Sequence, residues 1–351
     1  MMIPDKTAVD NTSKDGYKLG GDRLTIRENV MAILQGEQPD CYFDMVDSFK
    51  VVPDPDYVLN RIPRDGKEHK ERWGVVKVWP DGAPGAHPLC TPDKVVLDDV
   101  LDWEEKVVFP DIEHLDWTEA KAFADSIDRS CYFPTLFMPG GLFERSHFLM
   151  GMEDAFCAYL EEPEAMSEML SAICDWKIRY LEIAADKIHP DLVHYQDDWG
   201  SKINLFLPPS VWREMIKPLH AKIVKAAHDL GMVFVHHADC FCQIIASDMA
   251  EIGIDAWQGV IPQNDILQIQ KDTDGKLAIV GGLDTPLLQS QNATDDEVRA
   301  AVRKMIDDYC PAGKFFPAMP TKSGFSDELV ALIQNEINAY GHQWAAEHPV
   351  K

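Results

Sequence analysis

The sequence predicts an α/β fold, a (β/α)8 TIM barrel with an N-terminal extension. From about residue 130 onwards, short apolar segments alternate with helical segments, which is the order that a parallel sheet covered by helices requires. No G-x-G-x-x-G motif follows the first expected strand, and this disfavours an open dinucleotide-binding sheet. We therefore expect one structural domain, in which residues 1–75 form an extension packed on the barrel and residues 76–351 form the barrel.

Apolar runs and the turn residues between them give the order of elements. Gly231 and Gly253 end two of the helical segments. The strands are expected at residues 41–46, 132–138, 192–197, 233–237, 256–260, 278–282 and 314–317, with a hairpin strand at 73–79. The helices are expected at residues 25–35, 164–187, 209–230, 242–251, 266–271, 295–309 and 326–346. The pattern leaves the eighth barrel strand unplaced.

The chain is strongly acidic, with 59 Asp and Glu against 33 Lys and Arg and a formal net charge of −26. Such a surface repels phosphate backbones and anionic lipids, so nucleic acid and membranes are not expected partners. We find no signal peptide and no apolar run near the roughly 20 residues of a membrane helix. The eight cysteines are scattered, which indicates reduced thiols. We expect a cytoplasmic protein, and a homodimer is compatible with the sequence.

Acids, imidazoles and a thiol follow the ends of three expected strands. In a barrel, the carboxyl ends of the strands meet at one rim and carry the chemistry. The residues concerned are Asp197, Asp198, His236, His237, Asp239, Cys240 and Asp284. Structural roles are the alternatives: Asp198 could cap the next segment, Cys240 could be an inert thiol, and Asp284 could equally well only order its turn.

This set contains two pairs of residues that are adjacent in the sequence, one of aspartates and one of histidines, and adjacency limits what the members of each pair can do. Like charges raise each other's pKa, so one carboxyl of the pair Asp197 and Asp198 could stay protonated. Side chains of a strand alternate between its faces, so only one of His236 and His237 can face the barrel lumen.

A histidine, an aspartate and a cysteine within five residues indicate a metal site, for which zinc is the best match. The expected ligands are His236, Asp239 and Cys240. A rival set, Glu153, Glu168 and His189, is excluded because its last two members lie near opposite ends of one expected helix, roughly 30 Å apart.

Aromatic residues also gather near the rim. Each is by default a core residue, and together they suggest a pocket for a flat aromatic ligand: Phe143, Phe148, Tyr195, Trp199, Trp257 and Phe316.

Longer passages carry a family resemblance. From Leu149 onwards they are MGMEDAFCAYLEEPEAM, YQDDWGSKINLFLPPSVWREMIKPLHAKI, VFVHHADC, EIGIDAW and GGLDTP. Two more, TIRENVMAILQGEQP and ERWGVV, lie nearer the N-terminus. In these passages the chain resembles the uroporphyrinogen decarboxylase superfamily, in particular its corrinoid-dependent methyltransferase branch.

The resemblance also allows comparison with the functional motifs of that superfamily. Its decarboxylases grip substrate carboxylates with an N-terminal motif that contains Arg, but the comparable region here, CYFDMVDSFKVVPD, has none. Its coenzyme M methyltransferases bind zinc through His-x-Cys and a distant Cys. His236 matches the His, whereas Ala238 stands in place of the first Cys and Met319, Pro320 and Thr321 stand where the second is expected. The remaining ligands are harder and suit an oxygen substrate.

The resemblance therefore implies the methyltransferase component of an O-demethylase, acting on a methoxylated aromatic or a similar small-molecule methyl donor. The methyl group would pass to a corrinoid on a separate corrinoid protein, because this chain has no D-x-H-x-x-G carrier motif and Ala226 replaces the Asp in its nearest run, AAHDLG. A decarboxylase and a non-catalytic corrinoid-handling protein are the alternatives.

Roles can then be assigned to the rim residues. Asp197 or Asp198 is expected to donate a proton to the leaving oxygen, and His236 is expected to face the lumen and to bind metal or donate a proton. A metal-free site, in which Asp197 keeps Asp198 protonated, is the competing account. The expected substrate-binding residues are Tyr195, His237, Trp257, Asp284 and Met319.

Overall fold

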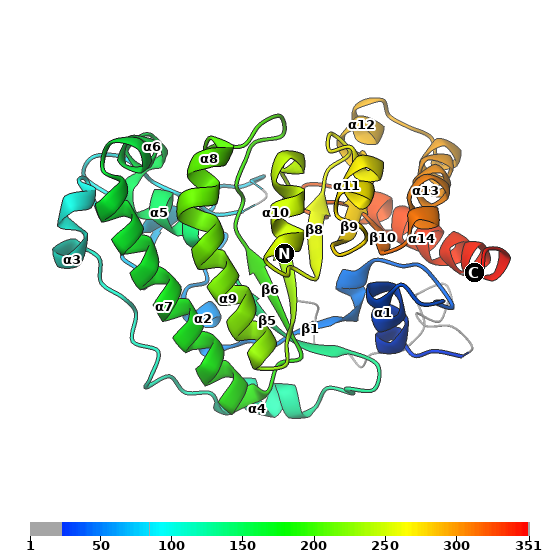
Figure 1. Ribbon diagram of the computed structural model, residues 1–351, viewed down its shortest axis with the longest axis horizontal. Coiled ribbons are helices and arrows are strands. Elements are labelled where there is room, and N and C mark those ends of the chain that lie inside the picture. Colours follow the sequence, from blue (N-terminus) through cyan, green and yellow to red (C-terminus); the bar gives the residue numbers. More distant parts are fainter. Residues whose placement is uncertain (1–22, 84, 350–351) are drawn as a thin grey trace.

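The computed structural model describes residues 23–83 and 85–349, and a curled parallel sheet forms its centre (Figure 1). Seven strands make up this sheet in the order β1-β5-β6-β7-β8-β9-β10. They are β1 Phe49–Val51, β5 Phe133–Met138, β6 Leu192–Gln196, β7 Val233–His237, β8 Ala256–Val260, β9 Ala278–Gly282 and β10 Phe315–Ala318. The expected α/β class and parallel sheet are confirmed. Within the described residues no ladder joins β10 to β1, so closure into a barrel stays a prediction.

Helices follow the strands and cover the sheet, with α7 and α9 side by side on one face of it (Figure 1). They are α1 Ile26–Gln35, α2 Pro55–Leu59, α3 Trp103–Lys106, α4 Thr118–Asp125, α5 Leu142–Met150, α6 Met152–Glu161, α7 Pro163–Ile188, α8 Pro209–Val211, α9 Lys217–Asp229, α10 Ala246–Glu251, α11 Ile266–Asp272, α12 Thr285–Ser290, α13 Asp295–Tyr309 and α14 Asp327–Glu347. Helix α7 continues without a break from Glu168 to its end, so Glu168 and His189 are separated along it as expected.

The strand expected at residues 41–46 is wrong. The carboxylate of Asp44 accepts a hydrogen bond from the backbone N–H of Val46 and caps a short 3-10 helix, Met45–Ser48. This cap turns the chain, and the strand forms only afterwards, as β1, which pairs in parallel with β5. The hairpin strand expected at 73–79 is β3, Val76–Val78, which pairs with β2, Glu68–Lys70, and β4, His87–Pro88, in a separate antiparallel sheet.

Helix α5 has no counterpart among the expected helices. Eight of its nine residues are buried, including Glu144, Arg145 and His147. Such a helix lacks the alternation of one apolar and one polar face that reveals a surface helix in a sequence.

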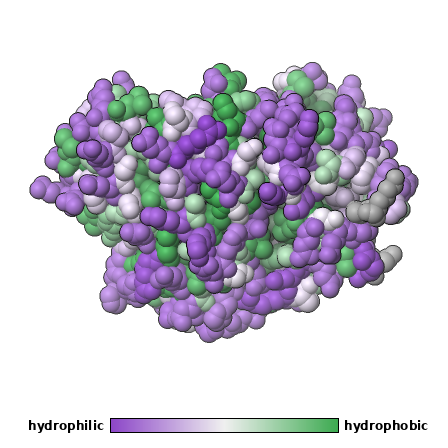
Figure 2. Space-filling model, in the orientation of Figure 1, coloured by the Kyte–Doolittle hydropathy of each residue, from purple (hydrophilic) through white to green (hydrophobic). Residues whose placement is uncertain are grey.

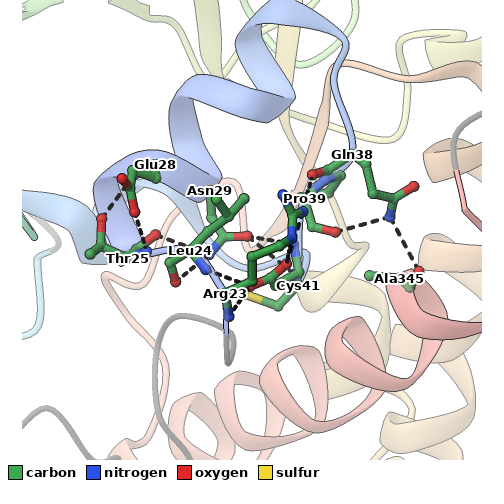
Figure 3. A network of polar contacts seen from close by, with 10 residues as sticks. Arg23, Leu24, Thr25, Glu28, Asn29, Gln38, Pro39, Cys41 and Ala345 are labelled. Atoms are coloured by element: carbon green, nitrogen blue, oxygen red, sulfur yellow. Dashed lines mark hydrogen bonds and ion pairs between the residues drawn. The ribbon is translucent and has the colours of Figure 1, made fainter.

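A network of polar contacts ties residues 23–41 to one another and, through Gln38, to α14 (Figure 3). The Asn29 side chain accepts hydrogen bonds from the backbone N–H groups of Asp40 and Cys41, and Gln38 donates to the carbonyl of Ala345 in α14. Glycine is required next to this contact, because a Cβ at Gly341 would lie 1.9 Å from the carbonyl oxygen of Tyr42.

Hydrophilic residues cover most of the face seen in Figure 2, in keeping with the high net charge. In the part of the chain that the structure describes, no helix combines the length and the apolar character needed to cross a membrane.

Candidate active site

The concave side of the curled sheet, which we call the lumen, is lined by alternate strand residues. His194 of β6 contacts Gln258 of β8, with 3.3 Å between Nε2 and Oε1, across the intervening strand β7. The ring of Phe49 in β1 likewise lies 5.5 Å from that of His194, across β5. Side chains on alternate strands meet in this way only on the concave face. His237 belongs to the same set, because it contacts both His194 and Gln258.

The other face of the sheet, which packs against the covering helices, carries Tyr195, His236 and Trp257. Each of these residues is next in the sequence to a position that faces the lumen. The three are neighbours across β6, β7 and β8. The rings of Tyr195 and His236 both pack against His220 of α9, at 5.0 Å and 5.1 Å. The expectation that His236 faces the lumen is therefore wrong, and His237 takes that place.

The surroundings of His236 suit a neutral core side chain. Its ring stacks on Trp199 with 4.0 Å between centroids, it is fully buried, and among the described residues neither ring nitrogen has a hydrogen-bond partner. Burial, with smaller contributions from His220 and His237, lowers the pKa of His236 well below its usual value. A neutral imidazole in this position is not a proton donor at neutral pH.

Gln258 fixes the orientation of His237 in the lumen. The Oε1 atom of Gln258 lies 2.5 Å from His237 Nδ1, and an amide oxygen only accepts hydrogen bonds. His237 Nδ1 must therefore carry a hydrogen, and in the neutral tautomer of the ring the acceptor nitrogen is then Nε2. The Gln258 amide nitrogen donates to the carbonyl of Pro320, so the same side chain ties the loop after β10 to the lumen.

Asp197 joins the end of β6 to the start of α5. Its fully buried carboxylate accepts hydrogen bonds from the backbone N–H groups of Phe143 and Glu144 and from the indole N–H of Trp199, at 3.1, 2.8 and 2.9 Å. Burial raises the pKa of Asp197 to about 6, although these three donors act in the opposite direction. Gly141 makes the approach sterically feasible, since a Cβ there would lie 2.2 Å from the Asp197 side chain.

Asp198 points the other way, to the rim of the lumen. It is half-buried, and its Oδ1 accepts a hydrogen bond of 3.0 Å from the backbone N–H of Asp239. Burial raises the pKa of Asp198; Asp239 adds to the rise, and His237 opposes it. The buried Glu144 nearby was not found from the sequence, and burial together with Asp198 and Asp197 raises its pKa well above the usual value. Asp198 is therefore the accessible carboxyl group at the rim, whereas Asp197 and Glu144 are buried near it.

The remaining expected site residues have identifiable structural contacts. The carboxylate of Asp284 accepts from the backbone N–H of Leu287 and caps α12, and Met319 is buried. Trp257 donates its indole N–H to the carbonyl of Ala238. His194 and Gln258 are lumen residues that sequence reasoning missed; a polar side chain in each apolar strand, LVHYQ and AWQGV, was the available signal.

His236, Asp239 and Cys240 do not converge on one point. His236 lies on the helix-facing side, Asp239 pairs with Lys202 at 2.9 Å, and the sulfur of Cys240 lies 3.2 Å from that of Cys242. In residues 23–83 and 85–349 no group of three or more His, Cys, Asp or Glu side chains is placed to hold a metal ion. The three residues therefore do not fit the zinc site that the sequence predicts.

Replacing Asp197 tests its role as the link between β6 and α5. Asp197→Ala should lower the free energy of unfolding by about 2 to 4 kcal/mol, because it leaves two backbone N–H groups and one indole N–H buried without an acceptor. Asp197→Asn should cost less, since one acceptor oxygen remains. Asp284→Ala, which removes the cap of a short helix, is the control, with an expected cost of about 1 kcal/mol. Denaturant unfolding measures all three, and equal costs for Asp197→Ala and Asp284→Ala would contradict the assignment.

A methyltransferase from Methanosarcina mazei has a similar fold, with a TM-score of 0.64 and 14% sequence identity, over 91% of this chain and 99% of that one. No curated protein sequence gives a significant match. The sequence profile of the uroporphyrinogen decarboxylase family matches residues 140–317, half of the 351 residues and the part that carries β6 to β10. The protein belongs to the uroporphyrinogen decarboxylase family.

Proposed function

We propose that the protein is a methyltransferase that takes a methyl group from an O-methyl donor, of the methoxylated aromatic class, and passes it to the cobalt(I) of a corrinoid on a separate protein. One observation carries the proposal: an accessible carboxyl group with a raised pKa, that of Asp198, lies at the rim of the lumen beside the oriented imidazole of His237. The methyltransferase from Methanosarcina mazei, which has a similar fold, supports the reaction class.

The chemistry of ether cleavage explains why such an acid is useful. When the methyl group leaves as CH3+, the bond between methyl carbon and ether oxygen breaks and its electrons stay on the oxygen, so a phenolate is released unless a proton arrives. The corrinoid of the partner would supply the nucleophile that accepts the methyl group. Asp198 would supply the proton to the ether oxygen and so stabilise the leaving group. No step is assigned to a metal ion, because the expected ligands do not converge.

The aromatic lining of the lumen supports the choice of an aromatic donor. The rings of Phe137 and Phe49 lie 5.4 Å and 5.5 Å from that of His194, and Tyr57 packs edge-on against Phe137 at 5.3 Å. Aromatic side chains of this kind offer flat apolar surfaces to a ring. His237, with its lone pair on Nε2, can accept a hydrogen bond from a phenolic O–H next to the methoxy group. We therefore assign ring binding to the lumen and proton donation to Asp198.

Methyl transfer from 2-methoxyphenol to a cobalt(I) corrinoid, followed by the change in corrinoid absorbance, tests the proposal. Asp198→Asn should lower kcat by roughly 100-fold or more, the usual contribution of a general acid. Because the protonated carboxyl is the active form, the rate should fall as the pH rises through the raised pKa of Asp198. Asp239→Asn removes one cause of the rise and should move this fall to lower pH. Full activity of Asp198→Asn, or a rate that increases with pH over this range, would overturn the acid role.

The two neighbouring histidines give a second test of the site. His237→Ala should lower kcat/KM for methyl transfer at least 10-fold, because it removes a residue oriented in the lumen. His236→Phe should leave methyl transfer within about 3-fold, since it keeps an aromatic ring on Trp199 and removes two buried nitrogens without partners. Circular dichroism and thermal unfolding establish that both variants fold. The opposite order of activity losses would place the chemistry on the helix-facing side.

A further inference from the structure

The loops at the carboxyl ends of the strands of the parallel sheet carry few basic residues. After β1 and β5 to β10, up to the next helix, the only lysines or arginines are Lys202 and Lys322. The same loops carry six aspartates, namely Asp54, Asp197, Asp198, Asp239, Asp265 and Asp284. Whether an anionic group could bind at this rim therefore depends on whether the two lysines are available.

Lys322 is held by two carboxylates. Its Nζ lies 2.8 Å from Asp44 and 3.2 Å from Asp47, and the side chain of Asp44 is only 3% exposed. Asp44 and Asp47 both belong to the segment CYFDMVDSFKVVPD, which leads into and follows β1. Lys322 lies two residues after Pro320, the residue that accepts the hydrogen bond from the lumen residue Gln258. The lysine in the loop after β10 is therefore already paired with two acids.

Lys202 is engaged in a similar way. Its Nζ contacts both the carboxylate of Asp239, at 2.9 Å, and the backbone carbonyl of the same residue, at 2.5 Å. Behind the rim, Arg145 and Lys77 both contact the buried carboxylate of Glu71. Arg145 and Lys77 share that one carboxylate behind the rim. Each of the two lysines in the strand-end loops has a carboxylate partner of its own, so a second carboxylate at the rim would meet no uncommitted cation in these loops.

From these ion pairs we propose that the site selects an uncharged methyl donor and rejects the same arene when it bears a carboxylate. The inference rests on the proposed function and names its substrate class. A carboxylate that leaves water without gaining a counterion or several hydrogen bonds pays a desolvation cost that nothing at this rim offsets. The net charge of −26 adds a repulsion that slows the approach of anions.

A matched pair of donors tests this inference. 2-Methoxyphenol and 4-hydroxy-3-methoxybenzoate differ by one carboxylate, and kcat/KM for methyl transfer should favour the first at least 10-fold. Calorimetry with the protein alone should give the same order of affinities, independently of the corrinoid. Equal or better turnover or binding of the benzoate would overturn the inference while leaving the methyltransferase proposal standing. If neither donor is bound or turned over, both the proposed function and the inference fail.

Variants of the ion pairs of Lys322 with Asp44 and Asp47 test whether these pairs contribute to the rejection of a donor that bears a carboxylate. The double variant Asp44→Asn and Asp47→Asn keeps the side-chain shapes but frees Lys322, so the kcat/KM of the benzoate relative to 2-methoxyphenol should rise at least 5-fold. Lys322→Gln should lower the same ratio, which keeps the test open if the double variant fails to fold. Asp248→Asn is the control, because it breaks a pair with Arg213 and Lys217 on the outer helices and should leave the ratio unchanged. An unchanged ratio in both Lys322-directed variants would contradict the role of this pair.

Discussion

The geometry of the candidate site depends on one buried carboxylate. Asp197 accepts three hydrogen bonds, two from the first turn of α5 and one from Trp199, and so fixes the end of β6 against the helix that follows β5. A carboxylate at a helix N-terminus is favoured both by the unpaired N–H groups and by the helix dipole. Because Asp197 is anchored on one side of the chain, Asp198 is presented on the other, at the rim of the lumen.

Because of this anchor, the two adjacent acids Asp197 and Asp198 differ in their hydrogen bonds and in their accessibility. Asp197 has hydrogen-bond donors on both oxygens and cannot readily exchange a proton with a substrate. Asp198 has a single backbone donor, from Asp239, and is accessible. The pKa of each is raised by burial, but only Asp198 lies where a ligand in the lumen could meet it. The lysines of the described strand-end loops are held in ion pairs. The proton transfer that we propose for Asp198 would therefore take place beside loops that offer no uncommitted cation.

Much of the sheet could be predicted from the sequence. Strands 233–237, 256–260 and 278–282 and the helix at 295–309 have the expected bounds, because each is a clear apolar or amphipathic run bounded by turn residues. The apolar residues of the segment 41–46 predict a strand, whereas the local hydrogen bond from the Val46 N–H to the Asp44 carboxylate decides its structure. Helix α5 escaped detection because almost all of its residues are buried, and burial on all sides leaves no periodicity.

The candidate site was only partly predictable for a different reason. Alternation along β7 requires that His236 and His237 point in opposite directions, but nothing in the strand itself says which of them faces the helices. Contacts with residues distant in the sequence decide which histidine faces which side of the sheet. His236 packs against His220 of α9, and His237 contacts Gln258 of β8. The metal ligands expected around His236 fail for the same reason, since one of the three faces away from the lumen. Position at the ends of strands was the useful signal, because it pointed to Asp198, Asp239 and His237, which the structure brings together. Their roles in a reaction stay predictions.

The position of a bound donor is the most direct test of this account. A crystal structure of the protein with 2-methoxyphenol should show the ring in the lumen, with its ether oxygen within hydrogen-bond distance of the Asp198 carboxyl and its hydroxyl group near His237 Nε2. A ligand found instead on the helix-facing side, against His236 and His220, or outside the parallel sheet altogether, would contradict the assignment of the chemistry to the lumen.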